Sequence, residues 1–168
     1  ERNQKEFSRL YQMSLLYLYH PSSAFYSCPL AMTDGATRAI ELYGDDHLRN
    51  HAFKNLTSRD EKQFWTSGQW MTEKSGGSDV SGTETIAKKT NKGYELTGLK
   101  WFTSATTSQM AMTLARIDGA EKGSRGLSLF YLELRNAQGQ LQNIEIHRLK
   151  DKLGTKALPT AELSLQGT

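Results

Sequence analysis

The amino-acid sequence predicts an α+β fold, with a helical N-terminal segment followed by an antiparallel β-barrel or sandwich. Between Phe7 and Leu56, apolar residues recur every three or four positions, which is typical of helices. From Thr66 onward the apolar residues alternate with a period of two, and turn residues separate the alternating stretches. We therefore expect a helical part at residues 1–64 and a β domain at residues 65–168.

The helical segment is expected to contain four helices. The first carries its apolar residues on one face and ends at Pro21, because proline cannot continue a helix. The second spans about residues 30–43 and stops at a glycine. The third follows the aspartate pair at 45–46 and runs to about residue 56. A serine or threonine at residues 57–58 is expected to open a short fourth helix, since acidic residues follow it.

The β domain is expected to consist of short strands joined by turns. The tripeptide Asn91-Lys92-Gly93 lies between two alternating stretches and predicts a hairpin. Further turns are expected where glycine, aspartate and asparagine interrupt the pattern. The expected strands are residues 86–90, 94–97, 109–117, 126–134, 141–147 and 162–165.

The composition excludes several classes of protein. A single cysteine, Cys28, allows neither an internal disulfide nor a thiolate metal cluster, and we expect it to be a small core residue in a reducing compartment. The longest apolar run is too short for a membrane span. Residues 85–168 carry 12 Lys+Arg and 7 Asp+Glu (+5), whereas residues 1–84 carry 9 and 11 (−2). The basic half fits either an anionic partner or a solvated lysine-rich surface.

The stretch WMTEKSGGSDV at residues 70–80 is the first candidate site. It lacks the glycine and lysine spacing of the common phosphate loops, and it is not a nucleophile elbow. In one interpretation its glycines let the backbone approach a ligand to which Thr72 and Ser78 donate hydrogen bonds. In the other it is a glycine-rich turn in which Asp79 binds its own backbone. Local features leave both open.

The stretch KWFTSA at residues 100–105 is the second candidate site. Its two aromatic residues either fill the β core or stack a flat ring, with Thr103 or Ser104 donating a hydrogen bond to that ring. His47 and His51 share a helix face, but no third ligand is evident, so we predict no metal site.

Taken together, the two stretches resemble the acyl-CoA dehydrogenase family. The resemblance is carried by Met71-Thr72-Glu73, Gly77-Ser78-Asp79 and Lys100-Trp101-Phe102-Thr103 at this separation. Lys74, the double glycine, CPLAMT at residues 28–33 and RLKDKLG at residues 148–154 are similar to the AidB-like branch. The resemblance implies that residues 1–64 end an N-terminal α-helical domain and that residues 65–168 are the middle β-barrel domain. A C-terminal helical domain is expected beyond Thr168.

The resemblance implies FAD as the cofactor and acyl-CoA as the substrate. Members of the family form trans-2-enoyl-CoA by α-proton abstraction and β-hydride transfer to flavin N5. The catalytic base is expected in the C-terminal domain, so we expect this 168-residue chain alone to be inactive and assign it no catalytic residue. Two of the expected cofactor-binding residues, Thr72 and Ser78, are also expected to bind substrate. The full expected cofactor set is Gln69, Met71, Thr72, Gly77, Ser78, Trp101, Phe102 and Thr103.

The resemblance also implies an electron-acceptor flavoprotein as a partner, a homotetramer and an intracellular location, in either the cytoplasm or the mitochondrial matrix. Two alternatives stay open. The first is an AidB-like flavoprotein with a DNA-protective role, for which DNA would be the partner. The second is a β-barrel interaction module with a helical arm and without flavin.

Overall fold

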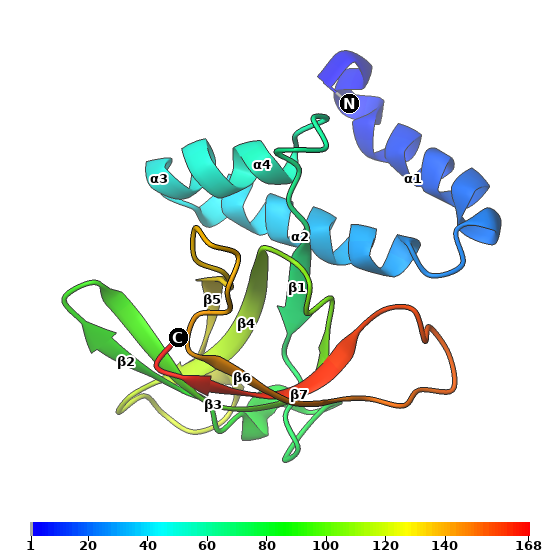
Figure 1. The fold of residues 1–168 in the computed structure, drawn as a ribbon. Helices are drawn as coiled ribbons and strands as arrows, with labels where there is room; N and C mark the ends of the chain where they lie inside the picture. The colour runs from blue at the N-terminus through cyan, green and yellow to red at the C-terminus, as the bar shows by residue number, and fades with distance from the viewer. Residues whose placement is uncertain (1) are drawn as a thin grey trace.

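The computed structural model describes residues 2–168, in which a group of helices covers one side of a curled seven-stranded sheet (Figure 1). The chain reverses direction after the first α-helix, and the second α-helix packs on the sheet. The helical segments in chain order are η1 (Arg2–Phe7), α1 (Ser8–Tyr19), η2 (His20–Ser22), α2 (Ser27–Tyr43), α3 (Asp46–Leu48), η3 (Arg49–Phe53) and α4 (Lys54–Leu56).

Three of the four expected helices are confirmed. The first is α1, and the second is α2, which begins three residues before the expected start and ends before Gly44. The third is the continuous run from α3 through the π-helical turn η3 to α4. Its cap is Asp45, whose Oδ1 accepts a hydrogen bond from the Leu48 N–H at 2.8 Å.

The expected fourth helix is wrong. Asp60 instead forms an isolated turn, because its carbonyl accepts from the Gln63 and Phe64 N–H groups and the helix does not continue. The chain then folds back on α4, where the Trp65 N–H donates to the Asn55 carbonyl at 3.1 Å. That tertiary hydrogen bond replaces the helical one.

The sheet is mixed, whereas the sequence predicted an antiparallel one. Its strands are β1 (Ser67–Trp70), β2 (Ile86–Thr90), β3 (Gly93–Ser104), β4 (Met110–Ile117), β5 (Leu127–Glu133), β6 (Ile144–Leu149) and β7 (Thr160–Gln166). Their order is β1-β4-β2-β3-β7-β6, and β5 pairs with the other side of β4. Both β1 and β2 run parallel to β4, while every other pairing is antiparallel. In the parallel pair of β1 and β4, Ser67 lies opposite Met110 and Trp70 opposite Thr113.

Two strands share one edge of β4. The first strand, β1, pairs with β4 as far as Thr113, and β2 pairs with it from Arg116 onward. Beyond Trp70 the chain leaves β4 and reaches β3, where the Trp101 N–H donates to the Thr72 carbonyl at 3.0 Å. The stretch WMTEKSGGSDV therefore crosses the place where β4 changes partner.

Two apolar cores hold these layers together. One lies inside the curl of the sheet and includes Trp70, Leu96 and Leu163. The other lies between α2, η3, α4 and the sheet and includes Ile40, Leu56 and Met110. Because the helices bury apolar area against the sheet, this packing contributes to the stability of both. The boundary expected between residues 64 and 65 stays a prediction.

Both α1 and Cys28 lie outside the apolar cores. Cys28 is exposed in the first turn of α2, so the expectation that it is a core residue is wrong. None of the helices in residues 2–168 has the length and apolar character needed to cross a membrane. The large apolar side chains that α1 exposes are Leu10, Tyr11, Met13, Leu15, Tyr17, Leu18 and Tyr19.

Candidate functional site

A tight turn begins the glycine-rich loop. The N–H of Glu73 donates to the Gly76 carbonyl at 3.0 Å, and the Gly76 N–H donates back to the Glu73 carbonyl at 3.2 Å. Lys74 and Ser75 therefore stand at the tip of the turn. Asp79 accepts from the Ser81 N–H at 2.9 Å, as the turn interpretation expected. The loop is thus fixed by its own backbone at both ends.

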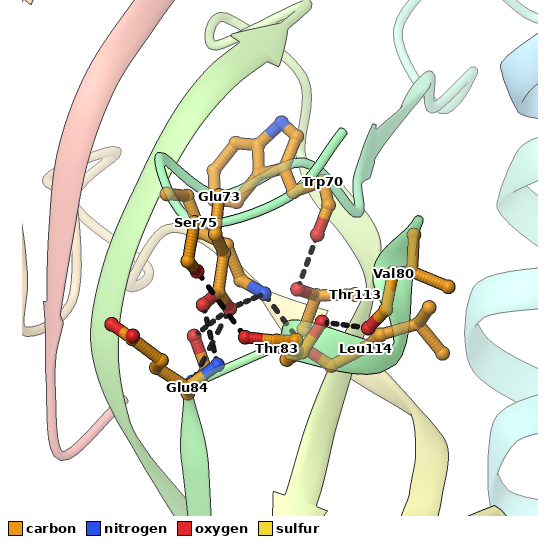
Figure 2. Close-up of polar contacts among 11 residues, drawn as sticks. Trp70, Glu73, Ser75, Val80, Thr83, Glu84, Thr113 and Leu114 are labelled. Atoms are coloured by element: carbon orange, nitrogen blue, oxygen red, sulfur yellow. Dashed lines mark hydrogen bonds and ion pairs between the residues drawn. The ribbon is translucent and has the colours of Figure 1, made fainter. Parts of the chain in front are cut away.

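A buried ion pair between Glu73 and Lys100 anchors this loop to the sheet, and Figure 2 shows Glu73 within its network of polar contacts. Nζ of Lys100 lies 2.7 Å from Oε1 of Glu73, and the two side chains are 0% and 3% exposed. The Glu73 carboxylate also accepts from the Glu84 N–H at 2.6 Å and from the Thr85 hydroxyl at 2.5 Å. Lys100 donates a second bond to the Leu114 carbonyl at 2.7 Å. Leu114 lies where β4 changes partner, so the pair fills the gap between β1 and β2.

The protonation states of this pair follow from its surroundings. Burial raises the pKa of Glu73, but the hydrogen bonds from Lys100, Thr85 and the Glu84 N–H outweigh burial and hold the pKa below its usual range. Burial lowers the pKa of Lys100, and Glu73 offsets part of that effect. Glu73 is therefore an ionised structural group and a poor proton acceptor.

The loop presents hydrogen-bond donors that the protein itself does not use. Within residues 2–168, neither the Thr72 nor the Ser78 hydroxyl has a hydrogen-bond partner. The backbone N–H groups of Gly77 and Ser78 are also unpaired in this part of the chain. Gly77 lies against Thr72, since a Cβ on Gly77 would stand 3.2 Å from Thr72 Cγ2. These donors are therefore available to a ligand.

Trp101 lies beside Thr72 and is half-buried, and three cations surround it. Nζ of Lys150 stands 3.6 Å from the indole centroid, Nζ of Lys74 stands 5.4 Å away, and Cζ of Arg148 stands 6.0 Å away. The sequence assigned Trp101 either to the β core or to a stacked ring. In the structure it is a partly exposed platform with cation–π contacts.

The other four expected cofactor residues lie in different places. Gln69 and Met71 line a small groove between α2 and the sheet. Phe102 is exposed and lines a shallow hollow formed with residues 150–155, so the interpretation as a core aromatic is wrong for Phe102. Thr103 is fully buried, and its hydroxyl donates to the Ala161 carbonyl at 2.7 Å.

A bulge explains why Thr103 faces inward. The register between β3 and β7 shifts between Lys100 and Thr103, so side-chain alternation changes within KWFTSA. Ser104, the alternative hydroxyl, is half-buried and shares a 2.9 Å hydrogen bond with Thr160. Thr103 as a cofactor contact stays a prediction, and its hydroxyl could donate to a cofactor only by releasing the Ala161 carbonyl.

The histidine pair shows another use in the fold. His51 packs edge-on against Trp65, and its Nε2 lies 3.5 Å from a Glu133 carboxylate oxygen. No group of three or more metal-ligating side chains occurs within residues 2–168. The rings of His47 and His51 are 5.8 Å apart and contact each other on the helix surface.

The sequence interpretation missed the basic side chains around Trp101. Arg148 and Lys150 are spaced two residues apart, the spacing that places side chains on one face of an extended chain. That spacing was the available signal. It did not identify Trp101 as their neighbour, because Trp101 is on β3 and is distant in sequence.

Comparison with known proteins places this geometry in a family. The family model described as acyl-CoA dehydrogenase, middle domain, matches residues 68–168. The chain belongs to the acyl-CoA dehydrogenase family, and this region is its middle domain. The chain is 53% identical to acyl-CoA dehydrogenase family member 11 of Caenorhabditis elegans, and the match covers 95% of this chain and 27% of that relative. It is 33% identical to putative acyl-CoA dehydrogenase AidB of Escherichia coli, covering 83% and 26%.

Solved structures support the same assignment. The Bd2924 apo-form is 69% identical with a TM-score of 0.91, and the match covers 96% of this chain and 33% of that one. Caenorhabditis elegans ACDH-11 in complex with C11-CoA is 52% identical with a TM-score of 0.87, over 95% and 28%. This chain therefore spans about a quarter to a third of the relatives it matches.

The unpaired donors of the loop fit FAD, the cofactor of this flavoprotein family. The edge of a flavin ring carries carbonyl and ring-nitrogen acceptors, and its pyrophosphate carries anionic oxygens. Thr72, Gly77 and Ser78 offer donors without partners, and Gly77 leaves space for a close approach. Thr72, Gly77, Ser78 and Trp101 are therefore the residues that fit the cofactor best.

Proposed function

We propose that the full-length protein is an FAD-dependent acyl-CoA dehydrogenase that converts acyl-CoA to trans-2-enoyl-CoA. The observation that carries this proposal is the set of unpaired donors on the loop that Glu73 and Lys100 anchor. The C11-CoA complex of the relative that is 52% identical supports an acyl-CoA ligand. FAD, when bound, would accept the β-hydride of the substrate.

The residues of this chain would bind and orient. The Thr72 hydroxyl and the Gly77 and Ser78 N–H groups would donate to the acceptors of the cofactor or substrate. Such donors stabilise negative charge that develops during reduction, provided that they are held in place before the reaction. The Glu73–Lys100 pair supplies that rigidity, because it joins the loop to β3 and β4.

The base that removes the α-proton is proposed to lie outside these 168 residues. Glu73 and Glu162 are both engaged in ion pairs, which favour their ionised forms but occupy their oxygens. The chain alone should therefore show no turnover when it is mixed with FAD, an acyl-CoA and a dye acceptor. Robust turnover by the 168-residue chain would contradict this part of the proposal.

The test of the main proposal uses the full-length protein. Its absorbance spectrum should show bound flavin, and an anaerobic series of acyl-CoA thioesters should bleach that flavin for at least one chain length. A colourless protein, or a flavin that no acyl-CoA bleaches, would overturn the dehydrogenase proposal.

The AidB-like role is the second candidate, and the 33% identity to putative acyl-CoA dehydrogenase AidB favours it. It predicts a flavin-containing protein that no acyl-CoA reduces and that binds DNA with a strong salt dependence. A protein without flavin would leave the β-barrel interaction module.

The same proposal includes assembly and location. We propose a homotetramer with an electron-acceptor flavoprotein as partner, located in the cytoplasm or mitochondrial matrix. Sedimentation of the full-length protein tests the homotetramer, and fractionation of cells tests the location.

A further inference from the structure

The cations around Trp101 come from two distant parts of the chain. Lys74 stands at the tip of the 73–76 turn, whereas Arg148 and Lys150 belong to β6 and the residue just after it. All three place their charge within 3.6 to 6.0 Å of the indole centroid. The turn cannot shift freely, because two backbone hydrogen bonds close it and the Glu73 side chain is buried. The cluster is thus built into the fold.

The charges in this cluster do not balance. Oε1 of Glu162 accepts from Arg148 at 2.7 Å and from Lys150 at 2.5 Å. Lys74 has no carboxylate partner within residues 2–168. Three positive charges therefore share one negative charge. Their mutual repulsion disfavours the fold, and such local conflicts are expected at functional sites.

Positive charge continues along the adjacent hollow. Nζ of Lys152 is bound by the Leu158 carbonyl at 2.7 Å and the Thr160 hydroxyl at 2.8 Å, both of which are neutral. Lys150 and Lys152 both line the hollow, and among the described residues the exposed Asp151 is the one acidic residue that lines it. This side of the candidate site is consequently suited to an anion.

We propose that Lys74, Arg148 and Lys150, gathered around Trp101, form a site that recognises the phosphate groups of an organic ligand. Arginine can bind a phosphate with two parallel hydrogen bonds, and lysine supplies a mobile point charge. The indole N–H of Trp101 is unpaired within residues 2–168 and adds a neutral donor. The proposal rests on the proposed function, which names FAD and acyl-CoA as the two phosphorylated ligands.

The site also lies next to the unpaired donors of the loop. The backbone N–H of Trp101 donates to the Thr72 carbonyl at 3.0 Å, which fixes the position of Thr72 relative to Trp101. One ligand can place an uncharged part against Thr72 and a phosphate against the cations. The sequence placed the neutral donors Gly77 and Ser78 among the expected cofactor contacts, whereas the structure adds charged donors nearby.

The test replaces Lys74 by methionine in the full-length protein. Lys74 is exposed and takes part in no ion pair within residues 2–168, so Lys74→Met should fold normally. Lys150→Met is the second variant, and its unfolding curve checks the loss of the Glu162 contact. Lys89→Met, on the exposed β2–β3 hairpin, is the matched control. Lys74→Arg keeps the charge and should rescue binding.

Each variant is measured with ligand pairs that differ in their phosphates. Apo-protein is titrated with FAD and with riboflavin, and holoprotein with an acyl-CoA and with the matching acyl-pantetheine. Loss of one charge-assisted hydrogen bond should weaken a phosphate-bearing ligand by roughly tenfold and leave its phosphate-free counterpart unchanged. Weaker binding of FAD would identify the flavin pyrophosphate as the group that the site recognises. Weaker binding of acyl-CoA would identify the coenzyme A phosphates, and either result supports the proposal.

Two results would overturn it. One is an equal loss of affinity for the phosphate-bearing and phosphate-free ligands. The other is that neither Lys74→Met nor Lys150→Met loses affinity for any ligand. If the full-length protein binds neither FAD nor acyl-CoA, the proposed function fails, and inorganic pyrophosphate becomes the probe. Pyrophosphate binding that Lys74→Met weakens and Lys89→Met does not would still support this site, while no measurable binding would reject it.

Discussion

Nζ of Lys100 lies 2.7 Å from Oε1 of Glu73, and both side chains are buried where β4 exchanges β1 for β2. The pair joins three parts of the sheet to the glycine-rich loop. Its stability matters for the site because the unpaired donors of Thr72, Gly77 and Ser78 lie within six residues of Glu73.

Lys100→Met should destabilise the protein strongly. It leaves the Glu73 carboxylate buried without its cation, which typically costs about 3–5 kcal/mol. The double variant Glu73→Gln with Lys100→Met should lose less stability than Lys100→Met alone, because no unpaired charge remains buried. Urea unfolding measures both free energies.

The control for that experiment is a surface ion pair. Arg38 and Glu41 are about half exposed, so Arg38→Ala should change the free energy of unfolding by about 0–1 kcal/mol. If Lys100→Met lowered the free energy of unfolding as little as Arg38→Ala does, that result would contradict the anchoring role of the buried pair.

Acid should weaken the fold partly through Glu162. The hydrogen bond from Arg148 is the main cause that lowers the Glu162 pKa from 4.5 to about 2. A folded-state pKa below the unfolded value contributes stability above the unfolded pKa and loses it as the pH falls. Stability should therefore fall between about pH 4.5 and pH 2, and Glu162→Gln should flatten this fall.

Urea unfolding at a series of pH values measures that difference. Glu73 and Asp34 also have lowered pKa values, so Glu162→Gln should still lose some stability as the pH falls. Parallel curves for the wild type and Glu162→Gln across this range would disprove the assignment to Glu162.

Thr72→Val should weaken the flavin without unfolding the protein. The substitution removes an unpaired hydroxyl from the loop, and loss of one ligand hydrogen bond should reduce FAD affinity by roughly tenfold. Titration of the full-length apo-protein with FAD gives the affinity. Thr107→Val is a matched control, since Thr107 is exposed and makes no hydrogen bond within residues 2–168. Equal FAD affinities for the two variants would count against Thr72.

The two adjacent glycines should respond differently to alanine. A Cβ on Gly76 would stand 2.2 Å from the Asp79 carbonyl oxygen, so the backbone must move. Gly76→Ala should therefore destabilise the protein by about 1–3 kcal/mol. A Cβ on Gly77 would meet only the Thr72 methyl at 3.2 Å, and Gly77→Ala should be the milder change. Thermal unfolding compares them, and the reverse order would contradict the loop geometry.

Local sequence signals predicted most elements of the fold. The helix ends at Pro21 and Gly44, the Asp45 cap and the Asn91-Lys92-Gly93 hairpin all depend on residues close in the chain. The parallel pairing of β1 with β4 was not predicted, because it joins segments more than forty residues apart. The Asp60 turn was missed because the Trp65–Asn55 hydrogen bond competes with a further helical turn.

The candidate site divides in the same way. Motifs in the sequence identified the loop at Thr72, Gly77 and Ser78 and the strand at Trp101, and the separation of the motifs pointed to the family. They did not predict that Thr103 turns inward, because the bulge in β3 depends on its pairing with β7. They also did not show that Lys74 and Lys150 meet at one indole.

The sequence by itself determined the helix–strand order, the two motifs and the family that they resemble, because propensity, turn residues and motif spacing are local properties. Only the tertiary structure decided that Lys100 neutralises Glu73 inside the sheet and that three cations surround Trp101. Those relations depend on strand register and on the point where β4 changes partner. Burial then sets the energy of the Glu73–Lys100 pair, since charge interactions are stronger where water is excluded.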